Sequence, residues 1–159
     1  MSYRAYIITS SDSGFAGERE DISGPAAGEM LKEAGFELAG YALLPDERLL
    51  LADKMREICD SGAADLIITT GGTGFSARDC MPEATLDICE RAVPGIPEAM
   101  RWYSLQITPR AMLSRAAAGI RGNTLIVNLP GSPKAVRENL GFVLPSLEHA
   151  IQMMLGGGH

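Results

Sequence analysis

The sequence contains few of the side chains that most often transfer protons or bind transition metals. Only two of its 159 residues are histidines and only three are cysteines. Cys59, Cys80 and Cys89 are odd in number and form no C-x-x-C pair, which argues against a disulfide framework and against a zinc site. His149 and His159 fall near the C-terminus, away from the glycine-rich and acidic segments of the chain. A Ser-His-Asp triad or a histidine-based acid–base mechanism is therefore poorly supported.

Long apolar runs and an excess of basic residues are also missing. No apolar run approaches the ~20 residues that span a bilayer, and the N-terminus lacks the basic and apolar regions of a signal peptide. Fourteen basic residues against twenty acidic ones give a net charge of −6, and no basic stripe of the kind that binds nucleic acid is present. We therefore expect a cytoplasmic protein with neither a membrane segment nor a nucleic-acid partner.

The length fits about one ordinary domain, and the chain shows no linker or internal repeat. Apolar runs typical of strands alternate with longer amphipathic runs, so the sequence predicts an α/β fold with a mainly parallel sheet and helices on both faces. One domain is expected over 1–155, with a flexible tail at 156–159. Strands are predicted at 3–9, 36–44, 66–70 and, as a hairpin-like pair, 116–120 and 124–129. Helices are predicted at 24–34, 47–61, 82–92, 94–105 and 134–155, the last with a break or kink near 141–145.

A glycine-rich run from 69 to 79 follows the predicted strand at 66–70. Gly71, Gly72 and Gly74 lack the Cβ that would hold a phosphate away from the backbone amides, and Thr73 between them adds a hydroxyl. Arg78 is a candidate partner for phosphate, and Asp79 is a candidate ligand for a divalent cation. The spacing fits neither a Walker A loop nor a G-x-G-x-x-G fingerprint. A strand-to-helix turn without a ligand is the alternative.

Polar loops follow the other predicted parallel strands as well. In open α/β sheets, ligands bind beyond the carboxyl ends of the strands, so these loops should converge on one rim. The residues concerned are Ser11 and Asp12 after the first strand, Asp46 after the second, and Pro130, Gly131, Ser132 and Lys134 after the last.

Two carboxylates on this rim, Asp46 and Asp79, suit Mg²⁺ that is held partly by substrate phosphates. Each has an alternative role as a helix cap.

Two basic residues each have two possible roles. Lys134, at the start of a predicted helix, either binds an anion or is a solvated surface lysine. Arg115 either contacts a ligand or forms an ion pair. With no histidine available, phosphoryl or nucleotidyl transfer is favoured, because an ionised phosphate already attacks without a base.

Taken together, the motifs resemble the molybdopterin adenylyltransferase family, which includes the pterin-binding G domain of gephyrin. The segments that carry the resemblance follow in the family's order: Ser11-Asp12-Ser13, Glu20-Asp21-Ile22-Ser23-Gly24, Leu44-Pro45-Asp46-Glu47, Thr69 to Phe75, Arg78-Asp79, Pro82-Glu83-Ala84-Thr85, Pro94-Gly95, Met112-Leu113-Ser114-Arg115, Gly119-Ile120-Arg121-Gly122 and Asn128-Leu129-Pro130-Gly131-Ser132. The resemblance implies a three-layer α/β domain that assembles as a homotrimer. It also implies Mg²⁺- and ATP-dependent transfer of AMP to the terminal phosphate of molybdopterin, with pyrophosphate released and a metal-insertion enzyme downstream.

The resemblance also assigns roles to residues. Asp46 and Asp79 are expected to be catalytic and to position the metal, while Gly71 to Gly74 and Arg78 bind the nucleotide. The pterin and its phosphate are expected to contact Ser11, Asp12, Ser114, Pro130, Gly131, Ser132 and Lys134. Cys80 and Met81 depart from the family pattern, which has an aliphatic residue and a threonine at these places. A non-catalytic molybdopterin-binding or scaffolding homologue, and an enzyme of related fold acting on another nucleotide, are the competing interpretations.

Overall fold

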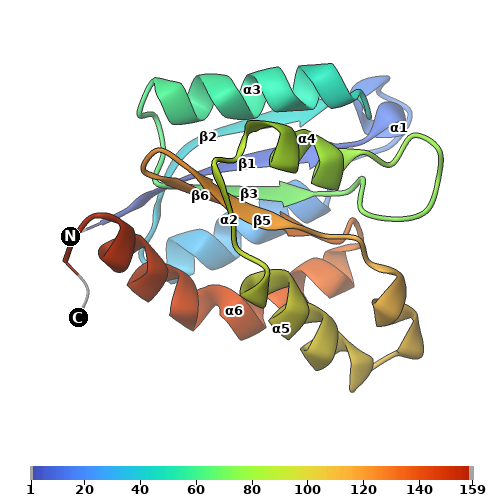
Figure 1. Ribbon diagram of the computed structural model, residues 1–159. Coiled ribbons are helices and arrows are strands. Elements are labelled where there is room, and N and C mark those ends of the chain that lie inside the picture. The colour runs from blue at the N-terminus through green and yellow to red at the C-terminus, as the bar shows by residue number, and fades with distance from the viewer. Residues whose placement is uncertain (1, 158–159) are drawn as a thin grey trace.

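The centre of the fold is a six-stranded sheet, seen in a computed structural model that describes residues 2–157 (Figure 1). The strand order is β2-β1-β3-β6-β5-β4. The strands are β1 (Arg4–Ser10), β2 (Glu37–Leu44), β3 (Leu66–Thr70), β4 (Arg91–Ala92), β5 (Ala118–Arg121) and β6 (Thr124–Leu129). The first four in spatial order are parallel, and β5 and β4 continue the sheet antiparallel. The predicted mainly parallel sheet is confirmed, as is the hairpin between β5 and β6.

Helices cover both faces of this sheet, which gives the three layers that the resemblance implies. Helices α2 (Ser23–Glu33), α5 (Gly95–Leu105) and α6 (Pro133–Met154) lie on one face, and α3 (Arg48–Asp60) and α4 (Met81–Ile88) lie on the other (Figure 1). All five residues of β3 are buried. A parallel strand covered on both sides has no solvated face, which is why its sequence is a nearly continuous apolar run.

One polar network crosses the otherwise apolar face beneath α4. Asn128 of β6 is fully buried, and its side-chain amide donates to the hydroxyls of Thr69 (3.0 Å) and Thr85 (2.9 Å). Its carbonyl oxygen accepts from the backbone amide of Ala117 at 3.1 Å. A buried amide in an apolar core is tolerated only when its donors and acceptor are satisfied. The network therefore fixes β6 against β3 and α4 on the side of the sheet opposite α2 and α6.

Two predicted helices differ from the observed ones. The helix expected over 82–92 ends at Ile88, because Cys89 is extended and the backbone amide of Glu90 donates to Ile120 at 2.8 Å, which starts the edge strand β4. Of the break or kink expected near 141–145, the break is wrong, since α6 is one continuous helix through Pro145. Val143, Leu147 and Ile151 of this helix are buried in the core, and their packing offsets the hydrogen bond that proline cannot donate to Gly141.

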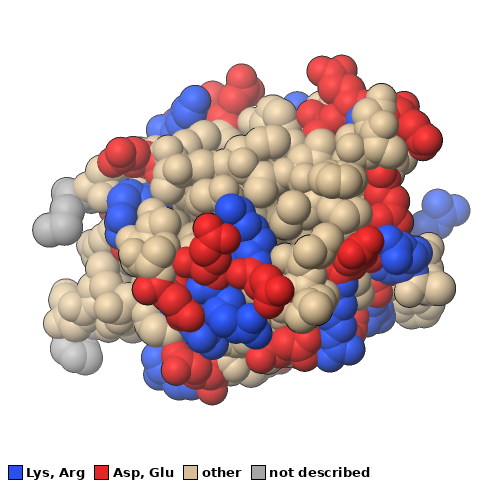
Figure 2. All heavy atoms as spheres, turned by 90° about the horizontal axis from the view of Figure 1, so that it is seen from above, with Lys and Arg blue, Asp and Glu red and all other residues tan. Residues whose placement is uncertain are grey.

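The face that carries α3 and α4 has acidic and basic side chains intermixed (Figure 2). Arg48 of α3 forms a bidentate pair with Asp87 of α4 at 2.7 Å, and Arg121 pairs with Asp60 at 2.9 Å. Within residues 2–157, no helix combines the length and apolar character that crossing a bilayer requires. Of the expected flexible tail, Gly156 and Gly157 donate to the last turn of α6, and residues 158–159 lie outside the described part.

Replacement of Asn128 by alanine is expected to destabilise the protein by about 3 kcal/mol, because two threonine hydroxyls and one amide lose their buried partner. The free energy of unfolding from urea titration checks this value. Asn123→Ala, in the exposed turn between β5 and β6, is the matched control and should change stability by less than about 0.5 kcal/mol. Equal stability of the two variants would contradict the structural role of the network.

Candidate functional site

The carboxyl ends of the four parallel strands meet at one rim. Ser10 of β1 is in register with Leu44 of β2, and Thr9 of β1 with Thr70 of β3, which is in turn in register with Leu129 of β6. The loops that leave these strands carry the residues singled out in the sequence. The register of the sheet therefore brings together segments that are more than a hundred residues apart in the chain.

Two glycines make the closest contact between these loops. Gly71 has a φ of +85°, a conformation that L side chains rarely adopt, and a Cβ at this position would collide with the carbonyl oxygen of Ser10. A Cβ on Gly131 would lie 3.3 Å from the Cα of Gly71. The loops after β1, β3 and β6 thus touch through backbone atoms, which requires glycine at position 71.

Asp46 lies at the centre of the acidic part of the rim. Its carboxylate accepts from the Ser10 hydroxyl (2.5 Å) and from the Asp12 amide (3.0 Å), and its own amide donates to the Asp12 carboxylate at 2.9 Å. Glu47, not Asp46, occupies the cap position of α3 and makes no side-chain capping bond. The alternative role of Asp46 as a helix cap is therefore wrong.

Arg78 neutralises the neighbouring Asp12. Its guanidinium donates to both oxygens of the Asp12 carboxylate, at 3.0 and 2.9 Å. The Arg78 guanidinium, together with the Asp46 amide, holds the pKa of the Asp12 carboxyl below its usual value. Arg78 was expected to contact a phosphate, and the structure shows it paired with the Asp12 carboxylate. Both side chains are exposed, so this pair is open to exchange with an incoming anion.

Asp79 is held by its own loop. Its carboxylate accepts from the Ser76 amide at 2.9 Å, and it does not cap α4, whose cap residue Cys80 makes no side-chain bond. The capping alternative for Asp79 is therefore wrong as well. Burial raises the pKa of the Cys80 thiol, and the carboxylates of Asp46 and Glu83 raise it further. Cys80 is accordingly a thiol and not the thiolate that a nucleophile requires.

Arg115 stabilises the glycine-rich loop through several hydrogen bonds. It donates to the carbonyl oxygens of Gly74 (2.7 Å) and Asp79 (2.9 Å) and pairs with Glu83 at 2.6 Å. Its backbone amide also donates to the Thr73 carbonyl at 2.9 Å. The Arg115 guanidinium lowers the pKa of the Glu83 carboxyl. The sequence left open whether Arg115 contacts a ligand or an ion-pair partner, and the structure shows the ion pair.

A polar pocket of about 320 Å³ lies on one side of the contact between Gly71 and Gly131. Ser11 and Ser132, two of the predicted site residues, lie in its wall. The N-termini of α2 and α6 both open into it, and helix N-termini attract anions. Its lining consists of Thr9, Ser10, Ser11, Gly14, Arg19, Glu20, Asp21, Ile22, Ser23, Thr70, Gly71, Gly131, Ser132 and Pro133.

Two buried hydroxyls in this pocket have no hydrogen-bond partner in the described chain. Thr9 and Thr70 are 4% and 1% exposed, and the hydroxyl of neither bonds to another described residue. The two lie side by side on β1 and β3, on the face of the sheet that carries α2 and α6. An unpaired buried hydroxyl is unfavourable, so this pair is a signal for a bound polar ligand that the sequence alone did not reveal.

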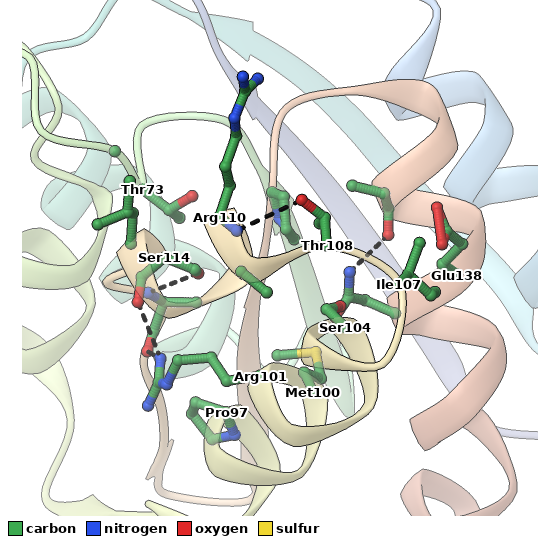
Figure 3. Close-up of a pocket in the computed structure, with 17 residues that line it drawn as sticks. Thr73, Pro97, Met100, Arg101, Ser104, Ile107, Thr108, Arg110, Ser114 and Glu138 are labelled. Carbon is green, nitrogen blue, oxygen red and sulfur yellow. Dashed lines mark hydrogen bonds between the residues drawn. The ribbon is translucent and has the colours of Figure 1, made fainter.

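A second, mostly apolar pocket of about 310 Å³ is lined by residues of the same two loops (Figure 3). It is formed by α5, by the 3₁₀ helix η1 (Pro109–Leu113), by the first turns of α6 and by the glycine-rich loop. Ser114, Pro130, Thr73 and Gly74 are in its wall. The structure thus divides the residues predicted to bind pterin between two pockets. Asp12, which is paired with Arg78, and Lys134, which is exposed in the first turn of α6, line neither of them.

An α/β domain with two pockets at the carboxyl edge of its sheet is typical of proteins that bind phosphorylated small molecules. The model of one protein family, described as "Probable molybdopterin binding domain", matches residues 6–149. Since the match covers most of the sequence, the chain belongs to this family of molybdopterin-binding domains.

Individual relatives are similar over nearly the whole chain. The molybdopterin adenylyltransferase of Helicobacter pylori is 42% identical over 152 residues, which are 94% of this chain and 86% of that protein. Gephyrin of Dictyostelium discoideum is 42% identical over 93% of this chain, which corresponds to 22% of that longer protein. The crystal structure of the molybdopterin biosynthesis enzyme MoaB from Thermus thermophilus superposes with a TM-score of 0.92 at 49% identity, covering 98% of each chain.

Replacement of Thr9 or Thr70 by valine is expected to stabilise the free protein by roughly 1 kcal/mol, because an unpaired buried hydroxyl is removed without a change of shape. The same substitution should weaken pyrophosphate binding about 5- to 50-fold, measured by calorimetry. Thr69→Val is the matched control on the opposite face of β3, where the hydroxyl is bonded to Asn128. It should lower stability and leave pyrophosphate affinity unchanged. Weaker folding of the Thr9 and Thr70 variants would show that these hydroxyls are structural.

Arg115→Lys is expected to make the glycine-rich loop more mobile, because an ammonium group cannot donate to Gly74, Asp79 and Glu83 at the same time, as the planar guanidinium does. Hydrogen exchange of the Ser76 and Asp79 amides should become faster, and stability at pH 7 should fall by roughly 1 kcal/mol. The pKa of Glu83 is lowered in the folded state. The ion pair of Glu83 with Arg115 therefore contributes fully to stability above the unfolded-state pKa of Glu83, and this contribution is lost as the pH falls through the lowered folded-state pKa. The stability difference between wild type and variant should therefore shrink in acid; a constant difference would exclude the Glu83 pair as its source.

Proposed function

We propose that this protein is a molybdopterin adenylyltransferase of molybdenum cofactor biosynthesis. In this reaction an oxygen of the terminal phosphate of molybdopterin bonds to the α-phosphorus of ATP, and the bond from that phosphorus to the bridging oxygen of the β-phosphate breaks. The products are adenylylated molybdopterin and pyrophosphate. The observation that carries the proposal is a pair of pockets built on the loops after β3 and β6, next to the acidic rim. Gly71 and Gly131 line the polar pocket, and Thr73, Gly74 and Pro130 line the apolar one.

The donor set fits Mg²⁺ bound together with substrate. Each oxygen of Asp46 accepts one hydrogen bond and keeps a lone pair for a cation. Across residues 2–157 no cluster of three or more histidine, cysteine or acidic residues is arranged to hold a metal ion. Mg²⁺ in nucleotide-dependent enzymes is held by one or two carboxylates, with substrate phosphates and water completing its shell. Asp46 and Asp79 would supply the carboxylates, and the ion would neutralise phosphate charge.

The chain's own groups orient and neutralise the reactants. The Ser10 hydroxyl and the Asp12 amide fix the Asp46 carboxylate, and Gly71 to Gly74 present the backbone that binds the nucleotide phosphates. Arg78 balances Asp12 and exchanges to a phosphate on binding. No proton acceptor is needed, because an ionised phosphate attacks directly, and positioning with charge neutralisation provides the acceleration.

We also propose a cytoplasmic homotrimer whose product is consumed by a metal-insertion enzyme. The apolar surface on α5 supports assembly, since Trp102 is 59% exposed although it packs beside Phe142 with ring centroids 6.2 Å apart. Exposed aromatic residues of this kind are typical of contact surfaces.

Asp79→Asn is expected to lower kcat for AMP transfer at least about 100-fold while molybdopterin still binds, because an amide cannot replace a carboxylate beside the metal and phosphates. The assay mixes purified protein, molybdopterin and Mg²⁺-ATP and detects adenylylated pterin with pyrophosphate. Asp46→Asn should behave alike, and EDTA should abolish turnover. Asp53→Asn is the control, since Asp53 only pairs with Arg56 on the surface of α3.

The competing interpretation is a molybdopterin-binding scaffold without catalysis. Tight pterin binding by the wild type without any adenylylated product would favour it. A full-speed Asp79→Asn variant would remove that residue from the mechanism and leave the reaction itself in place. Failure to bind pterin and to consume ATP would overturn the proposal.

A further inference from the structure

The apolar pocket in Figure 3 contains one carboxylate with no assigned role, that of Glu138. Glu138 lies in the second turn of α6 and is half-buried. Within the part of the chain that the structure describes, its side chain forms no hydrogen bond and no ion pair with another residue. An unpaired carboxylate in the wall of a mostly apolar pocket is a strong candidate for ligand recognition.

Most other polar groups of this pocket are bonded to the protein. The Ser104 hydroxyl donates to Asn139 at 3.0 Å, and the Asn139 amide donates to the Ala135 carbonyl at 2.8 Å. Arg101 donates to the carbonyl oxygens of Ser114 and Ala116. Arg110 is exposed and extends away from Glu138 (Figure 3). Glu138 is therefore the charged acceptor that remains for a ligand in this pocket.

We propose that Glu138 recognises the amino-pyrimidinone edge of a pterin ring bound in this pocket, an inference that rests on the proposed function. That edge presents an exocyclic amino group beside a ring N–H, which are two adjacent donors that match the two oxygens of a carboxylate. Adenine presents an amino donor beside a ring nitrogen that accepts, so one carboxylate oxygen would face a lone pair. The carboxylate consequently selects the pterin, and the adenine of ATP binds elsewhere.

The dimensions and position of the pocket agree with this assignment. Its volume of about 310 Å³ is at the lower end for ligand pockets, which suits one bicyclic ring with the rest of the substrate outside. Thr73 and Gly74 in its wall belong to the glycine-rich loop, and Pro130 precedes Gly131. A ring in this pocket therefore lies against residues that adjoin, along the chain, the two glycines of the polar pocket, where we place the reacting phosphate.

Glu138→Gln tests the assignment, because it keeps the size of the side chain and places an NH₂ group against the donors of the ring. The dissociation constants of molybdopterin and of a simple pterin are measured by pterin fluorescence in the absence of ATP. We expect both to rise about 10- to 100-fold, with the KM for ATP and the kcat at saturating molybdopterin nearly unchanged. Glu148→Gln is the matched control, since Glu148 is exposed on the same helix and should change none of these values.

Unchanged pterin affinity in Glu138→Gln would overturn the inference, and so would a raised KM for ATP with intact molybdopterin binding. Guanine shares the donor edge of pterin, so GTP is titrated in parallel; Glu138-dependent GTP binding that is tighter than pterin binding would assign the pocket to a guanine nucleotide instead. Because binding is measured without ATP, it separates the two proposals. Glu138-dependent pterin binding by a protein that forms no adenylylated product would overturn the transferase activity and retain the role of Glu138.

Discussion

The backbone contact between Gly71 and Gly131 holds the site together. It fixes the loops after β3 and β6 against each other, and the same Gly71 lies against the carbonyl oxygen of Ser10 at the end of β1. Ser10 in turn bonds to Asp46 after β2. One close approach of main-chain atoms thus sets the separation of the two pockets and the position of the acidic rim. Because the loops contact through backbone, the register of the parallel sheet, and not the choice of loop side chains, determines the geometry of the site.

The electrostatics of the rim are balanced before any substrate arrives. Asp12 is paired with Arg78, Asp46 accepts from a hydroxyl and an amide, and Asp79 accepts from the Ser76 amide. Three carboxylates would otherwise repel a phosphorylated substrate. An exposed ion pair contributes little to stability. In the function proposed above, Arg78 would therefore exchange from Asp12 to a phosphate at small free-energy cost, and the freed acidic groups would be available to the proposed cation.

Much of this arrangement follows from the sequence, because strand order and the ends of parallel strands obey simple rules. The rim with Asp46, Asp12 and the glycine-rich loop was predicted from the apolar runs that precede them. The partner of Arg78 was not, since the contact with Asp12 joins residues 66 positions apart and no local pattern encodes it. The early end of α4 and the unbroken α6 depend on pairing with β5 and on core packing, which override local propensity. Glu138 belongs to no motif, and only the fold places it in the wall of a pocket.

Arg115 and Arg101 join the apolar pocket to the acidic rim. Arg101 holds the carbonyl oxygens on both sides of Arg115, and Arg115 holds Gly74 and Asp79. A ligand that tightens the segment around Ser114 therefore also tightens the loop that presents Asp79. By thermodynamic linkage, if one substrate raises the affinity of the other by some factor, the second raises the affinity of the first by the same factor. If the two substrates bind as proposed, the Arg101 and Arg115 hydrogen bonds are the contacts through which the binding of one would strengthen the binding of the other.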